Sequence, residues 1–411
     1  MGAGHASVQL TWVLSWFYIS PEIDLPQQQS PNQYDPRGIK MNREQSIIEE
    51  MLHLAKIHIA GSEPWDIHIH NEHFYRRILS DAVLGLGESY MDGWWDCEDL
   101  DEFIYRLIKA ELEKQISPLK ILMPVLKSKI MNLQTKVRAR RDVSYHYNLG
   151  NELFQNMLDK RMTYSCGYWK DSDNLNAAQE AKLDLVCKKI QLEPGMMLLD
   201  IGCGWGSLLK FASEKYGVKS VGITLSEAQV KLGRELCEGL PVEIKLLDYR
   251  DLNGKYDRIV SIGMFEHVGS KNYNNFMKIV NHCLNDDGIF LLHTIGAKTT
   301  ATTSDPWTAK YIFPGGMLPM VSQIAAASEG FFVMEDWHNF GYDYSRTLQA
   351  WYHNFNRNWE KIKSEHYDER FYRMWKYFLL SCAGSFRARR NQLWQIVFSK
   401  KGIPGGYISI R

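Results

Sequence analysis

Net charge and long apolar runs are both missing from this 411-residue sequence. Lysine plus arginine number 48, and so do aspartate plus glutamate. The chain as a whole therefore has no field that would recruit nucleic acid or membrane, and any such attraction must be local. The apolar stretch from Val8 to Ile19 is too short to span a bilayer, and no lysine or arginine precedes it as in a secretory signal. These absences predict a protein that is soluble or peripheral to a membrane.

Cysteine pairs and zinc motifs are missing as well. The seven cysteines are odd in number and scattered, with no CxxC pair, which argues against a disulfide framework or a thiolate zinc site and fits a reducing cytoplasm. His68, His70 and His73 have a metal-like spacing, but no HExxH or similar zinc pattern accompanies them. We therefore expect no metal ion, and a solvated polar strand at these histidines.

The composition along the chain divides it into three regions. Residues 1–40 contain a Pro/Gln/Asn-rich segment from Pro21 to Arg37 and are expected to be a disordered leader, with Met41 as a candidate start of the folded protein. Residues 41–142 have mainly helical periodicity and are expected to form a helical domain associated with lipid or membrane. Residues 143–411 form the third region, in which strands and helices alternate.

The second region ends in a basic amphipathic segment. Between Lys114 and Arg141 there are eight lysines or arginines and no acidic residue, with apolar residues between them. This pattern predicts a surface that binds anionic membranes, and a solvated helix packed on its own domain is the alternative. Earlier in the region, Gly85, Gly87 and Gly93 are expected to break the run from Leu84 to Trp95 into turns.

The third region predicts an α/β fold with a mainly parallel sheet covered by helices. Strands are expected at 197–200, 219–223, 242–247, 258–262, 288–293 and 393–398, and late helices around 348–362 and 369–381. The first strand leads into the glycine turn Gly202-Cys203-Gly204-Trp205-Gly206 and then into a helix. Glycines let the backbone approach a ligand closely, and ligands of such sheets bind at the carboxyl ends of the strands.

Two cofactors fit a turn of this kind. Nicotinamide dinucleotides prefer Gly-x-Gly-x-x-Gly and an acid about twenty residues later, but here the third glycine comes one residue early and the second strand ends without an acid. Asp200 suits the cationic amino group of S-adenosylmethionine, and Asp248 could accept a hydrogen bond from an adenine amine. A purely structural turn is the alternative, and the polar residues Asp200, Thr224 and Asp248 at three successive strand ends argue against it.

Long segments of the sequence resemble the cyclopropane fatty acid synthases and their mycolic acid relatives. Between Ile47 and Ser399 the matching segments are 85–95 (GLGESYMDGWW), 146–151 (HYNLGN), 164–169 (YSCGYW), the glycine turn, 263–269 (GMFEHVG), 291–296 (LLHTIG), 311–314 (YIFP), 335–341 (EDWHNFG) and 381–387 (SCAGSFR). Motifs of this length are highly specific. The resemblance implies a seven-stranded, Rossmann-like class I methyltransferase sheet, preceded by a smaller, mainly helical domain.

The resemblance also implies an activity and a site. The enzyme would transfer a methylene group from S-adenosylmethionine to the cis double bond of an unsaturated acyl chain in a membrane phospholipid, with a bound bicarbonate ion as base. We expect it in the cytoplasm, peripherally on the inner membrane surface, without a nucleic acid partner; a homodimer is compatible with the sequence but not required by it. The expected cofactor-binding residues, including the two acids inferred from strand ends, are Tyr164, Ser165, Asp200, Gly202, Cys203, Gly204, Gly206, Thr224, Leu225, Ser226, Gln229, Asp248, Tyr249 and Arg250.

The implied catalytic residues are Cys166, Glu266, His293 and Tyr344, which would hold the bicarbonate, and Cys382, which matches a cysteine sometimes designated as a nucleophile. An alkene has no polar handle, so the reaction needs an anion that stabilises a developing cation and a base that removes a proton from the new methyl group.

Each of these residues also has a structural interpretation. His293 could be a core histidine, Glu266 a helix cap and Cys166 an ordinary buried thiol. Cys382 lies in an apolar helical segment with no adjoining cation, so we interpret it as structural rather than nucleophilic.

Two other functions stay open. A methyltransferase of tRNA or DNA would use the basic stretch, but the Asn/Asp-Pro-Pro-aromatic motif of many such enzymes is missing and the overall charge is balanced. A non-catalytic lipid-binding protein on the same scaffold would bind S-adenosylmethionine without turnover, and the intact Asp200, Glu266 and His293 argue against it.

Overall fold

A computed structural model describes residues 43–112, 150–298 and 305–411 of the chain. The expected leader and the basic stretch lie outside these residues. The first described part is a helical unit of α1 (Arg43–Leu54), α2 (His73–Met91) and α3 (Leu100–Lys109). It also contains a two-stranded antiparallel ribbon of β1 (His68–Ile69) and β2 (Trp95–Asp96). His68 is therefore in a short, partly exposed strand, where His70 lies 2.9 Å from the Asp96 carboxylate.

The seven-stranded sheet that the resemblance implied is confirmed, with the order β5-β4-β3-β6-β7-β9-β8. The strands are β3 (Met197–Ile201), β4 (Lys219–Thr224), β5 (Val242–Leu246), β6 (Tyr256–Ile262), β7 (Leu284–Ala297), β8 (Val333–Asn339) and β9 (Asn391–Ser399). The strands β3 to β7 are parallel to one another, and β9 pairs antiparallel with both β7 and β8. Periodicity did not predict β8, because this edge strand is largely polar and only Asp336 in it is fully buried.

Alternation along the strands gives the sheet two apolar faces. Leu198, Val260, Leu291 and Val397 face α7 (Leu175–Lys189) and α8 (Ser207–Tyr216). The neighbouring residues Leu199, Ile259, Phe290 and Phe398 face α10 (Tyr273–Cys283) and α12 (Val321–Ser328). The helix α9 (Glu227–Leu236) covers β4 and β5. The result is a three-layered α/β sandwich, as the alternation of elements predicts.

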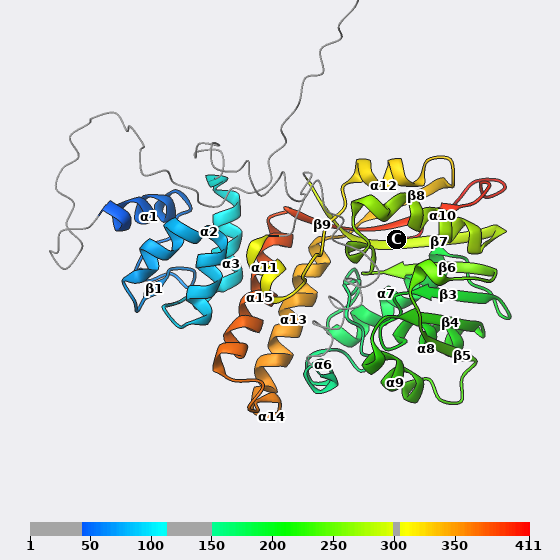
Figure 1. Cartoon of the computed structure of the whole chain (residues 1–411), viewed down its shortest axis with the longest axis horizontal. Coiled ribbons are helices and arrows are strands. Elements are labelled where there is room, and N and C mark those ends of the chain that lie inside the picture. The colour runs from blue at the N-terminus through cyan, green and yellow to red at the C-terminus, as the bar shows by residue number, and fades with distance from the viewer. Residues whose placement is uncertain (1–42, 113–149, 299–304) are drawn as a thin grey trace, which may run out of the picture.

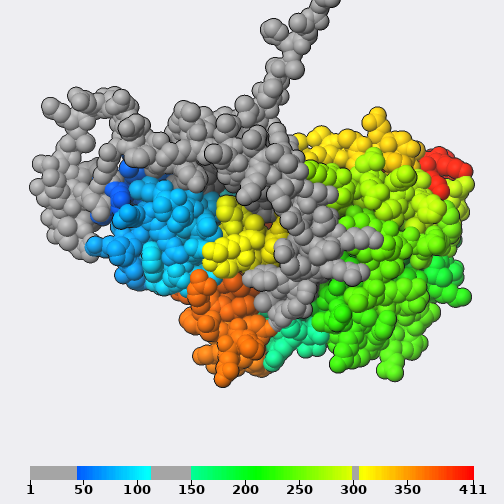
Figure 2. Space-filling model, viewed as in Figure 1, coloured from blue at the N-terminus to red at the C-terminus, as the bar shows by residue number. Residues whose placement is uncertain are grey.

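A second helical layer joins this sandwich to the N-terminal unit. It contains α6 (Asn151–Met157), α11 (Pro306–Tyr311), α13 (Tyr342–Arg357), α14 (Trp359–Ile362) and α15 (Glu369–Arg387). Figures 1 and 2 show the C-terminal helices of this layer (α11, α13, α14 and α15), in yellow to orange-red, between the blue helical unit and the green sheet. One hydrophobic cluster runs from Ile48 of α1 to Trp375 and Phe386 of α15. The N-terminal unit therefore shares its core with the C-terminal helices.

The expectation that Gly85 and Gly87 form turns is wrong, because both lie inside α2, whereas Gly93 does lie in the turn that follows α2, with a φ angle of 71°. A Cβ at Gly87 would come within 2.4 Å of the Trp307 ring of α11. Similarly, a Cβ at Gly384 of α15 would lie 2.5 Å from the carbonyl oxygen of Asp101 in α3. Glycine is needed at both places so that the N-terminal unit can approach the C-terminal helices closely.

Within the described residues, no helix combines the length and apolarity needed to cross a membrane. The same residues contain no cluster of three or more His, Cys, Asp or Glu side chains arranged to hold a metal ion.

Candidate active site

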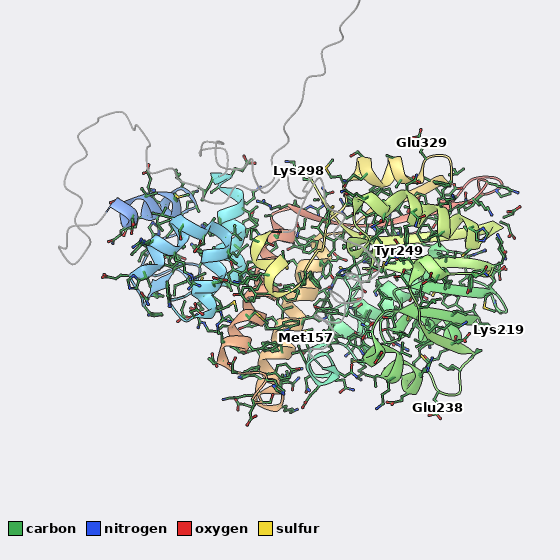
Figure 3. The ribbon with its side chains drawn as sticks, viewed as in Figure 1. Met157, Lys219, Glu238, Tyr249, Lys298 and Glu329 are labelled. Atoms are coloured by element: carbon green, nitrogen blue, oxygen red, sulfur yellow. The ribbon has the colours of Figure 1, made fainter. Side chains whose placement is uncertain are left out.

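A cleft opens at the carboxyl ends of β3, β4, β5 and β6. Figure 3 places Tyr249 at this inner end of the sheet, toward the C-terminal helices, whereas Lys219 at the amino end of β4 lies on the outside of the molecule. Every expected cofactor-binding residue lines the cleft except Gly206 and Ser226. Gly206 instead lets α8 begin beside Ile244 and Cys237. Ser226 caps α9, because its side chain accepts a hydrogen bond from the Gln229 amide.

The glycine turn provides room for a ligand. Gly202, Gly204 and Gly206 have φ angles of 90°, 56° and 83°, a conformation that side-chain-bearing residues rarely adopt. A Cβ at Gly204 would meet nothing within 4 Å, although Gly204 lines the cleft. This space is where a cofactor could lie against the backbone.

One end of the cleft carries a buried acid and a buried lysine. Asp200 at the end of β3 and Lys182 on α7 are only 3% and 1% exposed. Lys182 Nζ donates to Ser165 Oγ at 2.8 Å, and Oδ1 of Asp200 has no hydrogen-bond partner within the described residues. Burial raises the pKa of Asp200 to about 7, although nearby Lys182 opposes the shift. Burial lowers the pKa of Lys182 to about 8, against the attraction of Asp159 and Asp200.

The other end of the cleft has polar groups that pair with each other. The Asp248 carboxylate accepts from Arg250 Nε at 2.8 Å and from Arg250 Nη2 at 2.6 Å. Thr224 Oγ1 donates to Gln229 Oε1 at 2.6 Å. Asp248 is therefore held in place by Arg250, and it would contact an adenine amine only through lone pairs that Arg250 leaves available.

A second cluster of polar groups lies where β6 and β7 end. Glu266, in a short 3-10 helix after β6, is 7% exposed, and its Oε1 accepts from the Ile295 amide of β7 at 2.6 Å. Its Oε2 has no partner within the described residues. Burial raises the pKa of Glu266 to about 7. The neighbouring residues Met264 and His267 line the cofactor cleft, so this carboxyl group lies next to it.

His293 on β7 has an unpartnered ring nitrogen as well. Gln395 on β9 lies directly across from it, and Gln395 Nε2 donates to His293 Nδ1 at 3.2 Å. Burial holds the pKa of His293 well below its usual range, so the ring is neutral. With Nδ1 as acceptor, the proton is on Nε2, and Nε2 has no partner in the part of the chain that the structure describes. The result is a buried hydrogen-bond donor available to a ligand.

The remaining expected catalytic residues are placed differently. Cys166 is fully buried, its Sγ donates to the Gly167 carbonyl at 3.1 Å, and burial raises its pKa well above the usual range. The Tyr344 ring packs 4.6 Å from that of Phe386 and 6.0 Å from that of Trp351. Cys382 is half-buried on α15 against the shared hydrophobic core, and desolvation raises its pKa to about 12. Such a thiol is a poor nucleophile. None of the five expected catalytic residues, Glu266 and His293 included, is among the residues that line the cofactor cleft.

Sequence reasoning missed Lys182 and Gln395. The signal in the sequence was a polar residue at a position that the periodicity of its helix or strand predicts to be buried. Lys182 falls four residues after Ala178 and four before Val186 on the buried face of α7, and Gln395 interrupts the apolar run of β9.

Comparison with known proteins decides the family. Residues 134–396 match the family described as mycolic acid cyclopropane synthetase. The chain belongs to this family. Within it, the chain is 54% identical to the cyclopropane-fatty-acyl-phospholipid synthase of Escherichia coli K12, over 88% of this chain and 94% of that protein.

Solved structures of the cyclopropane synthetase family have the same fold. The cyclopropane synthase MmaA2 from Mycobacterium tuberculosis is 31% identical, covers 66% of this chain and all of its own, and has a TM-score of 0.60. The mycolic acid cyclopropane synthase CmaA1, complexed with SAH and CTAB, is 32% identical over 64% of this chain and 98% of its own, with a TM-score of 0.58. These matches confirm the expected class I methyltransferase fold.

The residues present fit the cofactor that this family implies. The cleft offers open space at Gly204 and an unpartnered acid, Asp200, for a cationic amino group. They also fit a small anion such as bicarbonate, because His293 Nε2 is an unpartnered donor and Glu266, with a pKa near 7, can donate when protonated.

Proposed function

We propose that this protein is an S-adenosylmethionine-dependent cyclopropane-fatty-acyl-phospholipid synthase. It adds a methylene group across the cis double bond of an unsaturated acyl chain in a membrane phospholipid. The similarity to the Escherichia coli synthase over almost the whole of both chains supports the substrate class. The observation that carries the chemistry is that two buried atoms, Glu266 Oε2 and His293 Nε2, have no partner within the described residues, while Met264 and His267, close to Glu266 in the chain, line the cofactor cleft.

The reaction balances as the gain of one CH₂ by the acyl chain and the release of one proton. S-adenosylmethionine, when bound, would supply this carbon as a methyl group: its S–CH₃ bond would break as the π electrons of the alkene form the new C–C bond, and S-adenosylhomocysteine would be the leaving group. Positive charge then develops on the acyl chain, and loss of a methyl proton closes the ring. The protein must therefore stabilise a cation and accept a proton in a site from which water is excluded.

Bicarbonate, when bound, supplies the base. In our proposal His293 Nε2 and the protonated Glu266 carboxyl donate hydrogen bonds to this anion, and Cys166 and Tyr344 complete its surroundings. Because the Glu266 pKa is raised to about 7, this group can also pass a proton on near neutral pH. Tyr164, Trp351 and Tyr344 form a series of rings with centroids 5.1 Å and 6.0 Å apart, and aromatic faces of this kind can stabilise a nearby cation.

Purified protein, vesicles of dioleoyl phosphatidylglycerol and S-adenosylmethionine test the proposal directly. Mass spectrometry of the extracted lipid should show a gain of one CH₂ per modified chain, with loss of the olefinic signal in the proton NMR spectrum. Vesicles with fully saturated chains are the control and should not change. A product that gains CH₂ but keeps an olefinic signal would contradict ring formation and indicate methyl branching instead.

We further propose that the protein works on the membrane surface, through the basic stretch from Lys114 to Arg141. Exposing an acyl chain to water costs about 0.8 kcal/mol per CH₂, so the chain must pass from the bilayer directly into the protein. Eight cations without an acid could each contribute about 1 kcal/mol near an anionic surface. Replacing Lys127, Lys129, Arg138 and Arg141 with glutamine should weaken sedimentation with anionic vesicles and make it less sensitive to salt. Equal binding by mutant and parent at two salt concentrations would place the membrane-binding surface elsewhere.

A further inference from the structure

Two lysines of α7 are buried, and only one of them lines the cofactor cleft. Lys182 is 1% exposed and Lys189 is fully buried. They lie seven residues apart on the same buried face of the helix, but Lys189 Nζ contacts His338 Nδ1 at 2.9 Å and does not reach the cleft. Burying an ammonium group is costly unless acceptors surround it. The buried Lys182 ammonium therefore requires acceptors, from the protein or from a ligand.

The protein itself satisfies Lys182 only in part. An ammonium group has three N–H donors, and in the described part of the chain Lys182 makes one hydrogen bond, to Ser165 Oγ at 2.8 Å. The nearby Asp159 uses its oxygens to accept from the amides of Arg161 and Thr163. Within the described residues, no direct ion pair joins Lys182 to Asp200, and Asp200 Oδ1 has no hydrogen-bond partner. The cleft thus has an unsatisfied cation and an unsatisfied anion at the same end.

The opposite end of the cleft does not share this imbalance. Asp248 and Arg250 form an ion pair at 2.6 Å, two strands away from Asp200 in the order β5-β4-β3. A distance of two strands is about 10 Å. A ligand that spans it should therefore have a polar, uncharged group at the Asp248 end. At the end near Asp200 and Lys182 it should have both an ammonium and a carboxylate.

We infer that Lys182 binds the α-carboxylate of the amino-acid portion of S-adenosylmethionine, while Asp200 binds the α-ammonium group. Lys182 is then the residue by which the enzyme selects ligands that keep this carboxylate. Ser165, which Lys182 orients, would be a second donor to the same group. The inference rests on the proposed function, since it takes S-adenosylmethionine as the cofactor.

The unmodified protein provides the first test. Its affinity for S-adenosylhomocysteine is compared, by isothermal titration calorimetry, with its affinity for decarboxylated S-adenosylhomocysteine, which keeps the amine and lacks only the carboxylate. Charge-assisted hydrogen bonds predict at least about 10-fold weaker binding of the decarboxylated ligand. Equal affinities would overturn the role of Lys182 and leave the proposed function intact. Failure of both ligands to bind would overturn the proposed function and this assignment with it.

The second test uses Lys182→Met, with Lys189→Met as its matched control on the same buried face of α7. Lys182→Met should lose at least about 10-fold in affinity for S-adenosylhomocysteine and little for the decarboxylated ligand. Lys189→Met should leave the ratio of the two affinities unchanged. An equal loss for both ligands in Lys182→Met would overturn the assignment, because it would mean that Lys182 only supports the shape of the cleft.

Discussion

Two parts of the candidate active site, the Asp248 end of the cofactor cleft and the polar cluster at Glu266 and His293, differ in how their polar groups are satisfied. At the Asp248 end, Arg250 donates to Asp248 and Thr224 donates to Gln229, so this part of the cleft keeps its shape without a ligand. Around Glu266 and His293 each side chain bonds to the sheet through one atom and leaves the other atom without a partner in the described residues. The first arrangement suits recognition of a cofactor. The second leaves hydrogen-bonding capacity for a reacting group, at a cost in stability.

This comparison predicts that changes in the cluster of Glu266 and His293 lower turnover, whereas changes at the Asp248 end lower cofactor affinity. Glu266→Gln should have the largest effect. Glutamine can still accept from the Ile295 amide through its Oε1, so the fold should hold, but it cannot exchange a proton. We expect turnover to fall about 100-fold or more, with cofactor affinity nearly unchanged. Steady-state kinetics and calorimetry with S-adenosylhomocysteine measure the two quantities.

Glu335→Gln is the matched control for Glu266→Gln. Glu335 also accepts from a backbone amide, that of Ile403 at 3.0 Å, but it lies on β8 away from the cleft. It should keep near-parental turnover. Near-normal ring formation by Glu266→Gln would remove Glu266 from the mechanism.

Gln395→Leu should have the next largest effect. It removes the donor that keeps the His293 proton on Nε2, so the ring can adopt the other tautomer. We expect turnover to fall about 10-fold, the equivalent of one hydrogen bond, without loss of cofactor affinity. Nitrogen NMR of labelled histidine should show the tautomer change.

Gln392→Leu, on the same strand but bonded to Asn339 at 2.8 Å, is the control for Gln395→Leu. It should leave the His293 tautomer unchanged. If Gln395→Leu lowers the melting temperature but leaves the His293 signal as in the parent, then Gln395 only packs the sheet.

Asp248→Asn should lower cofactor affinity rather than turnover, and its effect should be smaller than those of the two preceding variants. Asparagine keeps the size of the side chain but loses the ion pair with Arg250, whose Nη2 lies 2.6 Å from the carboxylate. We expect cofactor affinity to fall about fivefold, with turnover at saturating cofactor unchanged, because asparagine still offers Arg250 one oxygen and the change removes about one hydrogen bond, roughly 1 kcal/mol. Titration of the cofactor concentration in the lipid assay gives both values. A fall in turnover at saturating cofactor would contradict this division of roles between the Asp248 end and the cluster of Glu266 and His293.

Cys382→Ser should have the smallest effect. The thiol is half-buried in the core shared by α3 and α15, and its raised pKa makes it a weak nucleophile. We expect turnover within about twofold of the parent, since serine fills nearly the same volume and any change in stability should be modest. A variant that keeps its circular dichroism spectrum and melting temperature but is inactive would show that the thiol has a chemical role.

The sequence by itself determined the sheet and the cofactor end of the site. The apolar patterns of β3 to β7 predict strands, and many of the residues that line the cleft lie at or directly after the ends of β3 to β6, so local sequence order places them at one edge of the sheet. The resemblance to the cyclopropane synthases supplied the seventh strand, which periodicity could not, because β8 is a polar edge strand.

Only the tertiary structure decided which polar atoms have partners. His293 and Gln395 are 102 residues apart in the chain, and pairing of β7 with β9 brings them together. Lys182 looks like an ordinary helical lysine until α7 packs on the sheet face from which Asp200 projects. The role of Gly87 likewise depends on Trp307, 220 residues later in the chain. Strands and the glycine turn depend on neighbouring residues, so the sequence could predict them. Burial and hydrogen-bond partners depend on segments that are distant in the chain, and for that physical reason only the tertiary structure decides them.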